Sequence, residues 1–205
     1  MTMALHEVGR PLPQVTEWTP LPELPVPAGI EACSLCQLSC QRSRVVWAEG
    51  NPLAPVMVVL DNPGAREDRE GNPFVCGTRQ TLRTCAQEAL LYPEDLYVTW
   101  VLKCRPVRAY DKEAARAACL PYLGQQVAEG AARVVVLMGN VALQAVLGNP
   151  TIEVKALRGQ VMTYADRPVV CSYHPLAARR RPNLLPYLVA DLRLAAQIAF
   201  RDVSR

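Results

Sequence analysis

The chain has 205 residues, half of them apolar and a fifth of them charged, which is typical of a globular protein. This composition excludes a disordered chain, a collagen-like fibre and a coiled coil, and no apolar run approaches the roughly 20 residues that a membrane span needs. Basic residues outnumber acidic ones by 22 to 19, and all but three of the basic residues are arginines, which suit contacts to phosphate or carboxylate. With no recognisable secretion signal, the expected location is cytoplasmic.

The first 28 residues contain six prolines and show no sustained apolar periodicity. They predict an extended leader, either disordered or ordered only on contact with the rest of the protein, followed by a single domain at residues 29–205. We expect Trp18 to attach this leader to the domain.

From residue 55 onward, short runs rich in β-branched residues alternate with segments of helical periodicity. The expected strands are residues 55–60, 96–101, 133–138 and 167–172, with 157–164 as a further short strand. The expected helices are residues 78–91, 112–129, 141–147 and 184–200. This alternation predicts an α/β fold with a parallel, doubly wound sheet.

Polar or turn-forming residues follow each of the four expected strands, at residues 61–64, 102–106, 139–140 and 173–175. Ligands of such sheets bind outside the carboxyl ends of the strands. The sequence therefore predicts a binding site at this edge of the sheet.

Four of the eight cysteines have a spacing that suggests a metal site. Cys33 and Cys36 form a C-x2-C pair, which presents two sulfurs from one turn, and Cys104 and Cys119 lie at a strand end and in the next helix. Four thiolates suit an iron–sulfur cluster or a structural zinc, and the wide separation does not match a compact zinc ribbon. The alternative is buried, unligated cysteines. The other four cysteines are expected to be core or incidental residues, with Cys40 as the rival ligand: Cys40, Cys76, Cys85 and Cys171.

The turn after the first strand offers two side-chain oxygens, on Asp61 and Asn62, that could hold a water. Pro63 and Gly64 let the backbone approach a ligand, and Phe74 could stack on a flat ring. The alternatives are an ordinary turn and a core phenylalanine.

His174 stands in a His-Pro turn at a strand end, where an imidazole could donate to negative charge developing on a substrate oxygen. Arg179, Arg180 and Arg181 follow it and could bind phosphates beside the site. A structural turn histidine and a solvated basic loop are the corresponding alternatives.

Together and in this order, these segments resemble the family 4 uracil-DNA glycosylases, the iron–sulfur branch of the uracil-DNA glycosylase superfamily. The resemblance runs from about Cys33 to Asp191. It rests on Cys33-x2-Cys36, residues 44–52 (RVVWAEGNP), Pro63-Gly64, Glu67-Asp68, residues 71–75 (GNPFV), residues 103–106 (KCRP), Cys119, Arg158-Gly159 and His174-Pro175.

The resemblance implies a three-layer α/β/α fold with a four-stranded parallel sheet and a [4Fe-4S] cluster on the four cysteines named above. It also implies a monomer that flips a damaged base, uracil above all, out of DNA and hydrolyses its N-glycosidic bond. His174 would donate to uracil O2, and Phe74 would stack on the base. Asp61 and Asn62 would place the water, and the Pro63-Gly64 turn would supply backbone contacts.

The sequence departs from the family pattern at three places. The first motif, usually Gly-Glu-Gly-Pro-Gly, carries Asp61 and Asn62, and Asn62 resembles the water-placing asparagine of other branches. Trp100 stands where the family has the asparagine that reads uracil, and its bulk and lack of an acceptor predict relaxed or absent uracil selection. Leucines that usually wedge into the duplex are replaced by the arginines at 179–181.

Two other functions remain open from the sequence. One is a DNA- or lesion-binding protein of the same fold with little or no catalysis. The other is an iron–sulfur redox or scaffold protein, with zinc as the alternative metal.

Overall fold

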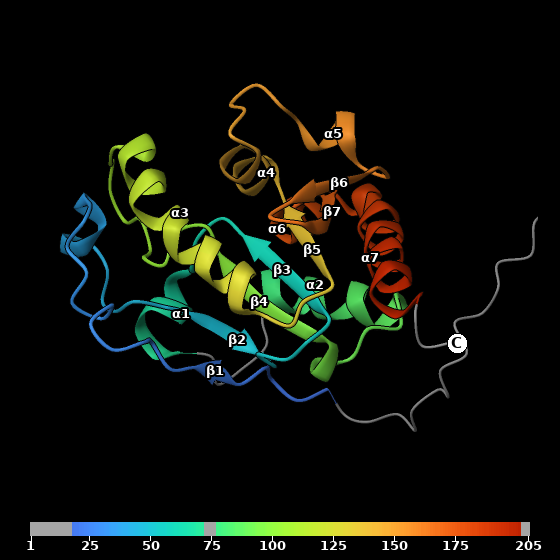
Figure 1. Ribbon diagram of the computed structural model, residues 1–205, viewed down its shortest axis with the longest axis horizontal. Helices are drawn as coiled ribbons and strands as arrows, with labels where there is room; N and C mark the ends of the chain where they lie inside the picture. The colour runs from blue at the N-terminus through green and yellow to red at the C-terminus, as the bar shows by residue number, and fades with distance from the viewer. Residues whose placement is uncertain (1–17, 72–76, 202–205) are drawn as a thin grey trace, which may run out of the picture.

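The computed structural model describes residues 18–71 and 77–201 (Figure 1). Phe74 and Cys76, and residues 1–17 of the predicted leader, lie outside the described residues. Seven strands form one sheet in the order β1-β2-β4-β3-β5-β7-β6. The strands are β1 (Glu23–Leu24), β2 (Ala48–Gly50), β3 (Val56–Leu60), β4 (Leu96–Trp100), β5 (Val134–Met138), β6 (Val161–Tyr164) and β7 (Arg167–Ser172).

The centre of the sheet is parallel, with β4, β3, β5 and β7 side by side. These are the four strands that the sequence predicts, within one residue at each end. Antiparallel β2 and β1 extend the sheet beyond β4, and antiparallel β6 extends it beyond β7. The expected strand at 157–164 is correct only for its last four residues, because Leu157 ends a short helix.

The central strands are buried on both faces, which explains their continuous runs of Val, Leu and Met. Alternate side chains of β3 point to opposite faces, so Val56 and Val58 belong to one core and Met57 and Val59 to the other. Every residue of β3, β4 and β5 is buried.

Helices cover both faces, so the three-layer α/β/α arrangement is confirmed. α2 (Thr78–Glu88) and α7 (Leu185–Phe200) pack on the face of Val56, and α3 (Lys112–Glu129) and α4 (Asn140–Leu147) on the face of Met57. The remaining helices are α1 (Ala65–Glu70), α5 (Val154–Leu157), α6 (Pro175–Arg180) and the 3-10 turns η1 (Gln37–Cys40), η2 (Pro93–Asp95) and η3 (Pro182–Leu184). Among the described residues, no helix is long and apolar enough to cross a membrane.

Part of the predicted leader packs against the domain. Trp18 and Leu21 are buried in the same core as α2 and α7, and the Trp18 ring lies 5.8 Å from the Arg83 guanidinium carbon. β1 then pairs with β2. Residues 18–24 thus contribute to one wall of the site described next.

Candidate active site

The carboxyl ends of β3 and β7 bring Asp61 and His174 together. Asp61 follows β3 directly, and His174 caps the N-terminus of α6 two residues after β7. The imidazole Nε2 lies 3.3 Å from Asp61 Oδ1. Two of the predicted catalytic side chains are therefore in contact, although 112 positions separate them in the chain.

The backbone fixes the tautomer and position of His174. The amide N–H of Leu176 donates to Nδ1 at 3.1 Å, so the neutral ring carries its proton on Nε2. A side chain at Gly139 would place its Cβ 3.0 Å from the Cβ of His174, and Gly139 has a φ of +92°. The absence of a side chain at Gly139, just after β5, therefore allows His174 to pack closely against the end of the sheet. Nε2 is buried and makes no well-aligned hydrogen bond within the described residues.

Asp61 is held as a carboxylate. Burial tends to raise its pKa, but the neighbouring His174 side chain and the N–H of Asn62 outweigh this effect and lower the pKa below its ordinary value of 3.8. The Asn62 N–H donates to Asp61 Oδ1 at 2.8 Å. At neutral pH, the imidazole therefore faces an anion.

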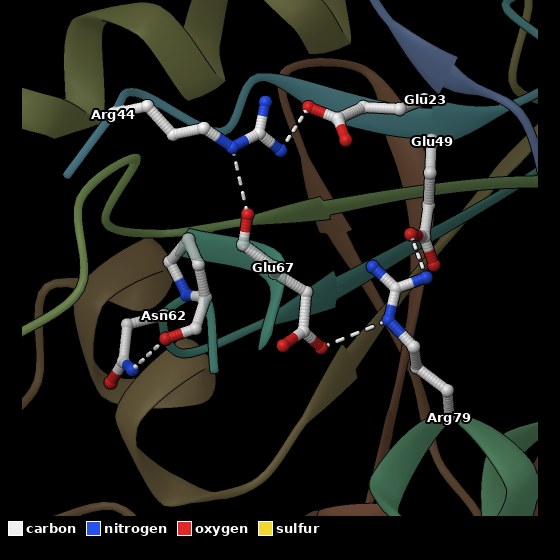
Figure 2. A network of polar contacts seen from close by, with 7 residues as sticks. Glu23, Arg44, Glu49, Asn62, Glu67 and Arg79 are labelled. Carbon is white, nitrogen blue, oxygen red and sulfur yellow. Dashed lines mark hydrogen bonds and ion pairs between the residues drawn. The ribbon is translucent and has the colours of Figure 1, made fainter. Parts of the chain in front are cut away.

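Asn62 has a fixed carboxamide. Its Nδ2 donates to the carbonyl oxygen of Pro63 at 2.9 Å, as Figure 2 shows. Since the nitrogen is engaged by the backbone, Oδ1 is the end of the carboxamide that can accept a hydrogen bond from a water.

A cavity of about 160 Å³ lies at this edge of the sheet. It brings together three of the predicted site residues that come from different elements, namely Asn62, Trp100 and His174, and it also contains Gly64. The other lining residues are Trp18, Leu21, Glu49, Leu60, Glu67, Thr78, Arg79, Leu82, Arg83, Leu96 and Leu176. Apolar walls with a few polar groups are typical of a small-molecule site.

A charged network (Figure 2) includes three of the residues that line this cavity, Glu49, Glu67 and Arg79. Arg79, from the first turn of α2, contacts the Glu49 carboxylate through Nη1 and Glu67 Oε1 through Nε at 2.9 Å. Arg44 Nε donates to the carbonyl oxygen of Glu67 at 2.9 Å, and its Nη2 pairs with Glu23. The network connects β1 and β2 to the helix that follows the Pro63-Gly64 turn.

Glu49 is 3% exposed, and burial raises its pKa to about 8 against the opposing effect of Arg79. The segment RVVWAEGNP at residues 44–52 contains this glutamate, but the sequence pattern alone assigns it no role. Arg79 is missed by sequence reasoning altogether, because an arginine in the first turn of a helix has no local signal that distinguishes it from a solvated one.

Trp100 is buried at the end of β4, with 2% of its surface exposed. The Arg79 guanidinium carbon lies 6.0 Å from the centroid of its ring. Lys103 is also buried, and its Nζ donates to Trp100 O, Thr99 Oγ1 and Gln126 Oε1 at 2.6–2.7 Å. Three oxygen acceptors thus satisfy the ammonium group and fix the backbone beneath Trp100.

The predicted DNA-binding arginines follow His174 on α6 and just after it. Arg179, Arg180 and Arg181 are exposed. The Nη1 of Arg179 comes within 3.1 Å of the position that a Cβ on Gly77 would occupy, so this side chain turns toward α2. All three lie within two helical turns of His174.

The four predicted metal ligands belong to one region. Arg42 Nη1 donates to the Cys104 sulfur at 3.3 Å and Arg42 Nη2 to the Cys33 carbonyl at 2.7 Å. Burial raises the pKa of Cys119, and the neighbouring thiols of Cys36 and Cys33 raise it further, an effect that requires proximity.

The donor set is purely thiol, which suits an iron–sulfur cluster. Within residues 18–71 and 77–201, no three His, Cys, Asp or Glu side chains come close enough to hold a single metal ion. Cys40 is exposed, and Cys85 and Cys171 are buried in the core as the sequence predicts.

Comparisons with known proteins place the chain in a family. The family model described as the uracil DNA glycosylase superfamily matches residues 47–193. A type-4 uracil-DNA glycosylase of Sulfurisphaera tokodaii is 32% identical over 177 residues, covering 82% of this chain and 80% of that protein. The type-4 enzyme of Pyrobaculum aerophilum is 32% identical over 176 residues, covering 80% and 88%. That of Thermotoga maritima is 29% identical over 165 residues, covering 79% and 86%. The chain belongs to the uracil DNA glycosylase superfamily, within its type-4 branch.

Proposed function

We propose that this protein removes uracil from DNA by hydrolysing the N-glycosidic bond of the flipped nucleotide and leaves an abasic site. The observation that carries the proposal is the buried Nε2 of His174, which bears a proton and lacks a well-aligned acceptor among the described residues. His174 lines the same cavity as Asn62 and Trp100.

In this proposal, His174 stabilises the leaving group. When the bond between C1′ and N1 breaks, the electron pair stays with uracil, and negative charge spreads to O2. The Nε2–H donates to this oxygen in a site shielded from water, where one such donor is worth about 3–4 kcal/mol. Because Nδ1 is engaged by Leu176, the ring is already oriented before substrate binds.

Asn62 and Asp61 would act on the attacking water and on the sugar. A water held by Asn62 Oδ1 attacks C1′ and loses a proton, while uracil gains one at N1 on its release. A carboxamide is a poor base, but the sugar is strongly cationic at the transition state, so holding the water in place suffices. The Asp61 carboxylate adds negative charge beside that cation.

The cysteines Cys33, Cys36, Cys104 and Cys119 would hold a [4Fe-4S] cluster. Their proximity and their all-thiol chemistry support this assignment. The cluster would join residues 33–36 to the segment after β4 and to α3. This is a structural role, and the hydrolysis uses no electron from it.

Arg180 and Arg181 would contact the DNA backbone beside the site, together with Arg179. If so, replacing the exposed pair by alanine should weaken binding to all DNA sequences alike. The dependence of affinity on salt should also become shallower, by about one unit of slope for each phosphate that is no longer neutralised.

The test is release of uracil by the wild-type protein from single-stranded oligonucleotides and from duplexes with uracil opposite guanine, compared with the same sequences carrying cytosine. Release from the uracil substrates alone is the expected result. DNA binding without release would instead support the inactive lesion-binding homologue.

A further inference from the structure

Arg79 has an unusual environment for an arginine in the first turn of a helix. Its side chain is only 12% exposed and contacts two carboxylates, Glu49 through Nη1 and Glu67 through Nε. Figure 2 shows the guanidinium between these two residues, which come from β2 and α1. A buried guanidinium held from two sides is a fixed group and not a mobile surface charge.

The same guanidinium belongs to the cavity described above. It lies 6.0 Å from the centroid of the Trp100 ring, and both residues line the cavity together with Asn62 and His174. Whatever base enters this cavity therefore meets Arg79 as well as His174.

Besides the acceptor oxygen of Asn62, several polar groups of the cavity are hydrogen-bond donors. A guanidinium carries five N–H donors, and the contacts of Arg79 within the described residues engage Nε and Nη1. Trp100 has only an N–H, and His174 presents Nε2–H. The side chains of Glu49 and Glu67 both contact Arg79. A ligand rich in carbonyl oxygens fits such a cavity.

Deamination of cytosine replaces a hydrogen-bond donor of the base by an acceptor. Cytosine carries an amino donor at position 4, and its deamination leaves a carbonyl oxygen, O4, in that place. An amino group would meet the guanidinium donor to donor, whereas O4 would accept from it. An unmatched buried donor pair is strongly unfavourable, which gives selectivity against cytosine.

We propose that Arg79 is a specificity-determining residue of this protein and that its guanidinium donates to O4 of the flipped uracil. The proposal rests on the glycosylase function proposed above and deepens it, because it identifies how a site with Trp100 in place of an asparagine can still select uracil. Glu49 and Glu67 orient the guanidinium for this contact.

A purely structural role for Arg79 must be distinguished from base reading. A Cβ at Gly64 would lie 2.5 Å from Glu67 Oε2, so Glu67 packs closely against the turn that carries Asn62. Loss of Arg79 could disturb that turn through Glu67 and slow the reaction without any contact to O4. The experiment therefore has to remove O4 as well as Arg79.

The kinetic test combines two enzymes with two substrates. Single-turnover base release is measured for wild type and Arg79→Met on oligonucleotides carrying uracil or pyrimidin-2-one, which lacks O4. We expect removal of O4 to slow wild type about 10- to 100-fold more than it slows Arg79→Met, as for a hydrogen bond to a charged group. Equal O4 effects in the two proteins would overturn the proposal. Should Arg79→Met fail to fold, Glu49→Gln/Arg79→Met takes its place, because it leaves no unpaired carboxylate at Glu49.

A binding test needs no bond cleavage. Single-stranded oligonucleotides carry a 2′-fluoroarabino uridine or cytidine, whose fluorine destabilises the cationic transition state and prevents release. The affinity of wild type for the uridine form should be at least about 10-fold higher than for the cytidine form. Arg79→Met should bind the two forms with equal affinity. Arg193→Met, which removes an exposed arginine that contacts the end of α2, should keep the wild-type preference.

The outcomes separate the two proposals. A uridine preference that depends on Arg79, in a protein that releases no uracil, would refute the glycosylase proposal and support base reading by Arg79. Uracil release by wild type, with an unchanged uridine preference in Arg79→Met, would support the glycosylase proposal and refute base reading by Arg79. A wild type with no uridine preference would overturn the role of Arg79.

Discussion

The Nε2 atom of His174 lies 3.3 Å from Oδ1 of Asp61, although the two residues follow strands that are separated by β5 in the sheet. The contact joins the proposed leaving-group donor to the carboxylate of the water-placing turn. Because His174 and Asn62 both act to lower the pKa of Asp61, its carboxylate is ionised at neutral pH. The two halves of the proposed reaction are thus positioned against each other before DNA binds.

The proposed role of Asn62 predicts an ordered series of variants. Asn62→Ala removes the oxygen that would hold the water and should slow single-turnover uracil release by about 100-fold. Asn62→Asp keeps an oxygen acceptor at the same distance from the backbone and should retain more activity than Asn62→Ala. If the two variants release uracil at the same rate, the side-chain oxygen has no role in the reaction.

Glu49 predicts a pH dependence of stability. Burial raises the pKa of Glu49 to about 8, so between pH 4.5 and 8 the folded protein binds a proton that the unfolded chain does not. The contribution of Glu49 to stability is therefore greatest below its ordinary pKa of 4.5 and is lost as the pH rises through about 8. Urea unfolding of wild type and Glu49→Gln between pH 5 and 9 measures this difference. Parallel stability profiles would show that Glu49 is ionised throughout.

The proposed cluster predicts metal content. Protein purified without oxygen should contain iron and acid-labile sulfide in equal amounts, and replacement of Cys33, Cys36, Cys104 or Cys119 by alanine should remove them. Cys40→Ala, with its exposed thiol, is the matched control and should keep the iron. A colourless protein containing zinc would contradict the cluster.

Arg42 should tune that cluster because it donates to the Cys104 sulfur at 3.3 Å. Hydrogen bonds to ligand sulfurs raise the reduction potential, so Arg42→Met should lower it while keeping the iron. A potential identical to that of wild type, measured by protein-film voltammetry, would argue against this contact.

Asp191 predicts a large effect on stability away from the site. This buried carboxylate on α7 accepts hydrogen bonds from Arg158 Nη2 and Ser172 Oγ, each at 2.8 Å. Asp191→Ala leaves Arg158 without its anion and should lower the free energy of unfolding by about 3–5 kcal/mol, measured by urea denaturation. Asp166→Asn changes an exposed carboxylate in a turn and should have little effect. A small effect of Asp191→Ala would mean that water replaces the missing carboxylate.

The parallel core of the fold could be predicted from the sequence because each central strand is a continuous apolar run buried on both faces. The edge strand β2 could not be predicted from the sequence. β2 consists of Ala48, Glu49 and Gly50, which have little strand preference, and it forms because β4 offers an unpaired backbone edge.

The same distinction applies to the site. Asp61, Asn62 and His174 could be predicted because they follow strands whose carboxyl ends must converge. Arg79 and Glu49 could not, because their burial depends on how α2 and β2 pack around the cavity. The sequence predicts that Trp100 disturbs the base pocket, and the structure places it beside the Arg79 guanidinium, which no local sequence pattern indicates.

Single-turnover release of uracil by wild type, His174→Ala and His174→Asn tests the central claim most directly. We expect release by wild type and a loss of about 100- to 1,000-fold in both variants. This includes His174→Asn, whose side-chain oxygen can still cap α6 but whose amide is too short to replace Nε2–H. Release by His174→Ala at the wild-type rate would show that His174 does not stabilise the leaving group.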